Sequence, residues 1–255
     1  MYTYGYEHDD AEVYAKEGQV IAGAAVGIIV IGQNCYPLVP GNVANATTFG
    51  FPVYYRPLKG GFVDKIVAIK PDPAVLEEII TAGRELEQQG CRAIVGACGY
   101  FANYLPEVAA ALNIPCFLSS LMQVPTISRA LKPNQKIGVL CANGQIMSSA
   151  PALDNCGVDR SRIVIAGCEG LSEMQNVLKN TGHLNNRRFE QQTVSVAKQL
   201  VADNPDIGAL LLECSDMPPY ACAIQKAIRL PVFDFTSMIN WVYGAVVRRR
   251  FAGYM

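Results

Sequence analysis

Charged residues are scarce in this 255-residue sequence: they make up 17% of the chain and leave a net charge of −1. A nucleic-acid-binding domain carries a basic surface, so this balance argues against that class. The sequence has only two histidines, His8 and His183, and none of its nine cysteines forms a CxxC motif. A zinc site of the usual cysteine and histidine type is therefore not expected, and a histidine-based catalytic triad has few candidates.

Long apolar segments are also missing. The N-terminal apolar run, residues 20–31, is too short to span a bilayer, and acidic rather than basic residues precede it. The cysteines lie mostly inside apolar runs, which is typical of reduced thiols and not of a disulfide framework. We therefore expect a cytoplasmic protein without a membrane partner. The Tyr-rich segment at residues 1–14 is interpreted as an arm that covers a partner subunit or is partly disordered.

Apolar residues make up 51% of the chain, enough for a sizeable core. Apolar runs of strand length alternate with helical patterns, which predicts an α/β fold with parallel sheets. The expected strands are 26–31, 63–69, 93–97, 115–118, 136–140, 162–166, 209–213 and 231–235. The expected helices are 72–90, 106–112, 145–155, 187–202 and 219–228. Residues 32–57, rich in Pro, Gly and Asn, predict a long irregular loop of functional interest.

Two windows of the sequence align without a gap. AIVGACGYFANYLPEVAAALNIPCF begins at Ala93, and ALLLECSDMPPYACAIQKAIRLPVF begins at Ala209. Cys98 aligns with Cys214, and the spacing from cysteine to the proline that opens the next strand is the same in both windows. A fainter match between the segments at Gly27 and Gly138 extends the repeat upstream. The chain therefore predicts two related α/β halves, each with about four parallel strands.

Both repeated cysteines end a strand and precede a helix. In open α/β sheets ligands bind beyond the carboxyl ends of the strands, so two facing halves would place Cys98 and Cys214 on opposite sides of one cleft. A helix N-terminus is expected to lower the pKa of a cysteine and to hold a carboxylate. One thiolate could then remove an α-proton while the other thiol delivers a proton to the opposite face. This chemistry requires no metal or organic cofactor.

These strand–cysteine pairs, AIVGACGYF and ALLLECSDM, resemble the aspartate/glutamate racemase superfamily, with its hydantoin racemase, arylmalonate decarboxylase and maleate isomerase relatives. The resemblance covers nearly the whole chain after about residue 24. It implies an active site between two pseudo-symmetric α/β domains, with Cys98 and Cys214 as the opposed acid and base. It also implies one domain made of residues 1–122 and 235–255 and another made of residues 123–234.

The substrate-binding candidates follow the strand ends and the motif positions. They are Asn34, Gly99, Tyr100, Ser119, Ser120, Asn143, Ser215 and Asp216. Amino-acid racemases of this group have Asn-Thr where this chain has Gly99 and Tyr100, so a non-amino-acid carboxylate is also open as the substrate. Tyr36 and Asn42 lie in the long loop, where ordinary turn chemistry accounts for them equally well.

The function that this pattern favours is a cofactor-independent racemase or epimerase of a small carboxylate. Two alternatives remain open: a decarboxylase or cis–trans isomerase of a small dicarboxylate on the same fold, and a non-catalytic ligand binder. A homo-oligomer is expected from the N-terminal arm and the apolar C-terminal helix.

Overall fold

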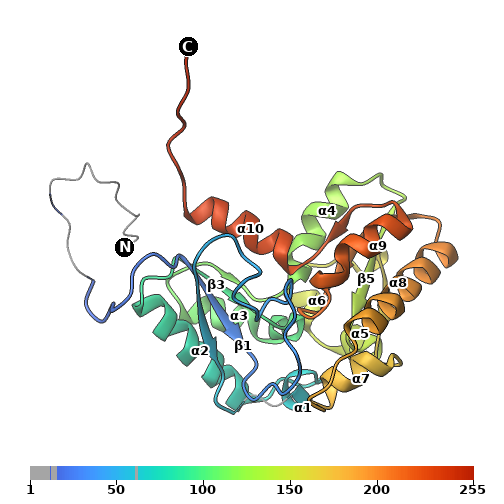
Figure 1. Ribbon diagram of the computed structural model, residues 1–255, viewed down its shortest axis with the longest axis horizontal. Coiled ribbons are helices and arrows are strands. Elements are labelled where there is room, and N and C mark those ends of the chain that lie inside the picture. The colour runs from blue at the N-terminus through green and yellow to red at the C-terminus, as the bar shows by residue number, and fades with distance from the viewer. Residues whose placement is uncertain (1–11, 13–15, 61–62) are drawn as a thin grey trace.

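Two four-stranded parallel sheets, flanked by helices, make up the protein (Figure 1). The computed structural model describes residue 12 and residues 16–60 and 63–255, so the predicted arm lies almost wholly outside the described residues. The first sheet has the order β2(Val53–Pro57), β1(Val26–Val30), β3(Ala93–Gly96), β4(Cys116–Phe117). The second has the order β6(Ile163–Gly167), β5(Lys136–Cys141), β7(Ile207–Leu212), β8(Val232–Phe233). This confirms the predicted α/β class with two similar halves.

Helices connect the strands and cover both faces of each sheet. The α-helices are α1(Val63–Ile66), α2(Pro73–Gln88), α3(Leu105–Ala111), α4(Val124–Ala130), α5(Gly144–Ser149), α6(Ala152–Asn155), α7(Ser172–Leu178), α8(Asn186–Asp203), α9(Ala221–Ile228) and α10(Phe235–Val246). Short 3-10 helices are η1(Gly99–Tyr104), η2(Ser120–Gln123), η3(Arg160–Arg162) and η4(Pro218–Tyr220).

The predicted repeat is present in the strand register. Ile94 of β3 pairs with Cys116 of β4, and Leu210 of β7 pairs with Val232 of β8, so the same pairing recurs after an equal offset in both strands. The strand-to-strand hydrogen bonds recur too: the Ile94 amide donates to Pro115, and the Leu210 amide donates to Pro231, both at 2.9 Å. The two halves therefore share connectivity as well as composition.

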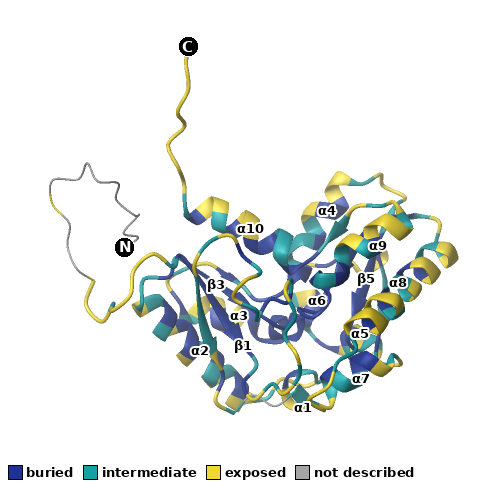
Figure 2. Cartoon of the chain, in the orientation of Figure 1, coloured by how far each residue is buried: buried dark blue, intermediate teal, exposed yellow. Residues whose placement is uncertain are grey.

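The first sheet is buried on both faces, which explains its continuous apolar strands. Val26, Ile28 and Val30 of β1 pack with α10, whereas Ile29 points to the opposite face and packs with α2. Figure 2 shows the resulting pattern, with buried strands inside and exposed residues on the outer surfaces of the helices. The strand ends that precede the repeated cysteines are thus held in a rigid core.

One predicted strand is wrong. Residues 63–69 do not join the sheet; Val63–Ile66 form the one-turn helix α1, and the strand beside β1 is β2 at Val53–Pro57, inside the stretch expected to be irregular. The β-branched residues of 63–69 suggested a strand, but here they point inward, with Ile66 fully buried. β2 escaped notice because it is an edge strand with partly exposed tyrosines and an arginine rather than an apolar run.

One predicted helix is divided. Residues 145–155 form α5 and α6, and the break falls at Ala150 and Pro151. Proline lacks the amide hydrogen that a continuous helix needs and clashes with the preceding turn. The break leaves Asn155 at the end of α6, where its side chain donates to the backbone oxygens of Ala102 and Asn103 in η1.

The rest of the long loop, between β1 and β2, is irregular as predicted. It packs against the second half of the chain at Gly41, whose φ of +98° suits glycine and where a Cβ atom would lie 2.9 Å from Pro219 Cα. The loop is therefore placed between the repeated strand ends rather than along the outer surface.

α10 returns the chain to the first sheet, where Phe235, Met238 and Ile239 pack in its core. The domain boundaries at 122/123 and 234/235 stay a prediction. Across the described ranges, no helix combines the length and apolar character needed to cross a bilayer.

The predicted N-terminus of α2 offers a stability test. Asp72 caps this helix by accepting a hydrogen bond from the Ala74 amide at 2.8 Å. We expect Asp72→Ala to lower the free energy of unfolding by about 1 kcal/mol because the amide loses its partner. Urea denaturation measures this change. Glu77→Ala, an exposed position on the same helix, is the control and should change stability by less than about 0.5 kcal/mol; equal effects of the two variants would contradict the capping role.

Candidate active site

The two repeated cysteines occupy equivalent positions at the ends of β3 and β7. The carbonyl oxygen of each accepts a hydrogen bond from the third residue after it, Phe101 in one half and Met217 in the other, both at 3.1 Å. Cys98 is 7% exposed and Cys214 is 8% exposed. Both line one cavity that lies between the halves. The proximity that the repeat predicted is therefore present in the fold.

The cavity draws its walls from both halves of the chain. The first half contributes the end of β1, the loop after it, α1 and the turn at Cys98; the second contributes the turns after β5 and β7 and one face of α7. The lining residues are Val30, Ile31, Asn34, Tyr36, Asn42, Ala44, Val63, Val67, Ala97, Cys98, Gly99, Tyr100, Ala142, Met174, Val177, Leu178, Glu213, Cys214, Ser215 and Asp216. This described lining holds two carboxylates and no lysine, arginine or histidine.

Hydrogen bonds join the two cysteine-bearing turns. Ser215 Oγ, next to Cys214, donates to the Ala97 carbonyl, next to Cys98, at 2.9 Å. The Tyr100 hydroxyl donates to the Asn143 carbonyl at 2.7 Å and accepts from the Asn143 amide at 3.2 Å. These bonds cross between the halves and set the position of one thiol relative to the other.

Asp216 is the centre of a buried polar cluster. Its Oδ1 accepts hydrogen bonds from Asn42 Nδ2 at 2.5 Å and from the Tyr36 hydroxyl at 3.0 Å, and its Oδ2 accepts from Cys214 Sγ at 3.5 Å. Burial raises the pKa of Asp216, and the hydrogen bonds from Asn42, Tyr36 and Cys214 oppose that rise. The long loop thus supplies the partners of a carboxylate that the repeat places beside the second cysteine.

The thiols differ from expectation in one respect. Burial raises the pKa of Cys98, Glu213 adds to the rise, and the amides of Tyr100 and Phe101 oppose it without reversing it. Burial raises the pKa of Cys214 as well, with Asp216 and Glu213 adding to the effect and the Asp216 amide opposing it. The expected lowering is wrong because desolvation and nearby carboxylates outweigh the helix-end amides. Both cysteines are therefore thiols at neutral pH before a ligand binds.

Glu213 is a third buried carboxyl group in this region, together with Asp216 and the more distant Glu173. It is fully buried, and its two carboxylate oxygens accept no hydrogen bond from the described residues. Burial raises the pKa of Glu213 to about 8, an effect that the Ala142 amide opposes only in part. A methyl group on Gly99 would overlap the Glu213 Oε1 atom, so glycine is needed where the carboxyl group meets the turn after Cys98.

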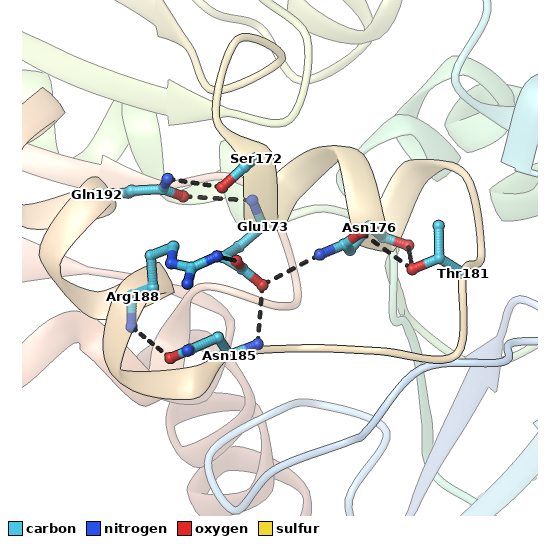
Figure 3. A network of polar contacts seen from close by, with 7 residues as sticks. All are labelled: Ser172, Glu173, Asn176, Thr181, Asn185, Arg188 and Gln192. Carbon is cyan, nitrogen blue, oxygen red and sulfur yellow. Dashed lines mark hydrogen bonds and ion pairs between the residues drawn. The ribbon is translucent and has the colours of Figure 1, made fainter.

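A network around Glu173 positions the wall formed by α7 (Figure 3). The Glu173 carboxylate accepts from the Asn185 amide at 2.8 Å, from Asn176 Nδ2 at 3.2 Å and from Arg188 Nη1 at 3.1 Å. Burial opposes ionisation of Glu173, but these partners outweigh it and lower the pKa. The network ties α7 to the start of α8, which fixes the helix that presents Met174 to the cavity.

The structure brings together most of the residues that the sequence singled out. Cys98, Cys214, Asn34, Gly99, Tyr100, Ser215 and Asp216 line the cavity. The other three lie outside its lining. Ser119 Oγ accepts from the Leu121 amide at 3.2 Å, Ser120 Oγ donates to the Leu212 carbonyl at 3.0 Å, and Asn143 caps α5 through the Ile146 amide at 3.0 Å. These contacts are structural, because each of these side chains is engaged with backbone rather than turned to the cavity.

The sequence analysis left three polar lining residues unassigned: Tyr36, Asn42 and Glu213. Tyr36 and Asn42 were considered only as loop residues, and their reach across 180 and 174 positions to Asp216 has no local signal. Glu213 was interpreted as the last residue of a buried strand. A charged residue at the end of an otherwise apolar run, directly before a repeated cysteine, was the available clue.

The chain belongs to the Asp/Glu/Hydantoin racemase family, whose sequence model matches residues 62–241. It is 30% identical over 239 residues to a dimethylsulfoniopropionate lyase from Durusdinium sp. clade D, covering 91% of this chain and 78% of that protein. It is 31% identical over 234 residues to dimethylsulfoniopropionate lyase 7 of Emiliania huxleyi, covering 88% of this chain and 67% of that protein.

Solved structures share the fold at low sequence identity. A variant of arylmalonate decarboxylase superposes with a TM-score of 0.56 at 16% identity, covering 90% of this chain and 97% of that one. A glutamate racemase from Bacillus anthracis gives a TM-score of 0.55 at 16% identity, covering 88% and 84% of the two chains. The aspartate racemase of Picrophilus torridus gives 0.55 at 16% identity, covering 90% and 96%. The family is thus one of racemases and related lyases and decarboxylases, which confirms the resemblance.

The Asp216 cluster can be tested without a substrate. Tyr36→Phe removes one donor to the buried carboxylate, so we expect the Asp216 pKa to rise further and the free energy of unfolding at pH 7.5 to fall by about 1.5–3 kcal/mol. Because a carboxyl group with a raised folded-state pKa weakens the fold as pH increases, the loss should be smaller at pH 4. Urea denaturation at both pH values measures it.

Tyr54→Phe is the matched control, because no hydrogen bond of the Tyr54 hydroxyl is recorded within the described part of the chain. The two tyrosine variants should differ at pH 7.5. An identical, small effect of both would show that Tyr36 does not support Asp216.

Proposed function

We propose that this protein is a lyase that eliminates a neutral dialkyl sulfide from a small sulfonium carboxylate of the dimethylsulfoniopropionate type. The observation that carries the proposal is the Asp216 cluster: a buried carboxylate beside Cys214 in a cavity whose described lining contains no cationic side chain. Such a lining favours a ligand with a positive group. The names of the relatives with about 30% identity over most of this chain support the same substrate class.

In this reaction the cationic sulfonium lies toward Asp216. The substrate carboxylate is assigned to the uncharged polar part of the lining, at Asn34 and the backbone of Gly99. A base removes a proton from the carbon next to the carboxylate, and the electrons of that C–H bond form the carbon–carbon double bond. The carbon–sulfur bond breaks, and its electron pair leaves with the sulfur as a neutral sulfide. The other product is an acrylate-type carboxylate, and the proton is later lost to water.

Cys98 is assigned as the base. The amides of Tyr100 and Phe101 favour its thiolate, whereas Cys214 donates its own proton to Asp216 and has one favourable amide. Burial raises the pKa of Cys98 in the empty cavity, and a bound sulfonium cation favours the thiolate because opposite charges within a few ångströms stabilise each other. The substrate's positive group therefore contributes both to binding and to formation of the base.

The direct test is incubation of the protein with dimethylsulfoniopropionate. We expect dimethyl sulfide in the headspace by gas chromatography and acrylate in solution by proton NMR. Cys98→Ser should lower kcat by about 10²- to 10⁴-fold, the usual contribution of a general base. Cys222→Ser, an exposed cysteine outside the cavity lining, is the control and should leave kcat unchanged. Absence of dimethyl sulfide from the folded protein would reject the proposed substrate class.

A second candidate function is racemisation of a small chiral carboxylate, as the sequence predicted. The observation that favours it is that both cysteines line the same cavity. Racemisation needs an acid and a base on opposite faces, whereas elimination needs one base.

The two candidates are separated by comparing Cys98→Ser with Cys214→Ser. For the lyase, we expect Cys214→Ser to reduce dimethyl sulfide release at least about 10-fold less than Cys98→Ser does, because Cys214 is not the base. For a racemase, both variants should lose turnover of a chiral α-substituted acid equally, followed by circular dichroism of the substrate. Equal losses of dimethyl sulfide release in the two variants would contradict the assignment of Cys98 as the sole base.

A further inference from the structure

Glu213 combines three properties that a purely structural residue rarely has. It is fully buried, its carboxylate oxygens have no hydrogen-bond partner among the described residues, and it lines the cavity that holds both cysteines. An unpartnered buried carboxyl group costs free energy. Buried groups of this kind concentrate at functional sites, where their ionisation is used.

The carboxyl group of Glu213 lies directly against the turn that carries Cys98. Only glycine fits at position 99, because a Cβ atom there would overlap Glu213 Oε1 and would lie 2.7 Å from the Glu213 backbone oxygen. The ionisable groups that Glu213 influences are Cys98, Tyr100, Cys141, Cys156, Cys168 and Cys214, and none of them is a cation. Cys98 is the one among them that lines the cavity next to Gly99.

We propose that Cys98 and Glu213 form an acid pair that shares one negative charge, in which Glu213 accepts the Cys98 proton when the substrate binds. The S–H bond of Cys98 breaks and an O–H bond forms on Glu213, so the pair keeps its charge and nothing is oxidised or reduced. The resulting thiolate is the base that removes the substrate's α-proton. This inference rests on the proposed function, since it names how the base of that reaction arises.

The electrostatics of the site agree with a shared charge. Two negative charges side by side in a buried region strongly disfavour each other, as in pairs of carboxyl groups that hold one proton between them. Burial raises the pKa of Glu213 to about 8, so the pair is uncharged well below pH 8 and carries one negative charge above it. A bound sulfonium cation then favours the form in which that charge lies on the sulfur.

This arrangement has a defined pH dependence. The form able to make a thiolate increases as pH rises through about 8, so kcat/KM should rise over the same interval. The same raised pKa means that ionisation of Glu213 weakens the folded state, and this loss grows from the unfolded-state pKa up to pH 8. Replacing Glu213 by glutamine is therefore not expected to weaken the fold at pH 9.

The decisive experiment measures the reactivity of Cys98 in the absence of substrate. Iodoacetamide is reacted with the protein from pH 6 to pH 10, and modification of the Cys98 peptide is followed by mass spectrometry. In the native protein the rate should rise with a midpoint near pH 8, because Glu213 takes the proton. In Glu213→Gln this rise should disappear, and the rate at pH 9 should fall about 100-fold.

The opposite result would overturn the proposal. If Glu213 acts only as a repelling charge, Glu213→Gln relieves that repulsion, and Cys98 should react faster than in the native protein. An unchanged rate would equally reject the pair. Glu169→Gln is the matched control: Glu169 influences Cys141 and Cys168 but lies outside the cavity lining, so its variant should retain the native profile.

Glu213→Asp keeps the acid and withdraws it by one methylene, so it should retain a pH-dependent rise at reduced rate, and it serves if Glu213→Gln does not fold. Failure of the pair and failure of the lyase proposal are distinguishable. Release of dimethyl sulfide with a native pH profile in Glu213→Gln would reject the pair and retain the lyase. A Glu213-dependent Cys98 profile without dimethyl sulfide release would retain the pair and reject the substrate class.

Discussion

The hydrogen bond from Ser215 Oγ to the Ala97 carbonyl, at 2.9 Å, joins the two strand ends on which the site depends. It connects the residue after Cys214 with the residue before Cys98, so neither turn can shift without the other. The equivalent parallel sheets bring the strand ends to the same level, and this bond holds them together. The bond from Ser120 to the Leu212 carbonyl supports the same junction one layer deeper.

Desolvation dominates the chemistry of this junction. Carboxyl groups from Glu213 and Asp216 and thiols from Cys98 and Cys214 are gathered in a region with no cationic side chain in its described lining. Each group raises the cost of a negative charge on the others, so the empty site holds its protons. A ligand with a positive group changes that balance, which is why the same acidic cavity can recognise a sulfonium and generate a base. The hydrogen bonds of Asn42 and Tyr36 leave Asp216 as the best-supported place for the negative charge opposite that ligand.

The strand pattern and the repeat were predictable because they are local. Seven of the eight expected strands lie within a few residues of the observed ones, and the gapless alignment of Cys98 with Cys214 identified both cysteines before any geometry was known. The missing strand, β2, is an edge strand, where packing on a neighbour matters more than apolar composition. The lyase chemistry suggested by the relatives was not among the alternatives that the residues alone raised, since the first step, removal of an α-proton, is shared by racemases and by β-eliminating lyases.

The sequence by itself determined the fold class, the duplication and the pair of cysteines, because these follow from periodicity and spacing along the chain. Only the tertiary structure decided which groups surround the thiols. Asn42 and Asp216 are 174 positions apart and meet because the long loop packs across the second half. The direction of the thiol pKa shifts was decided there too, because helix-end amides are a local feature, whereas burial and the approach of Glu213 to Gly99 arise only when the two halves close on each other.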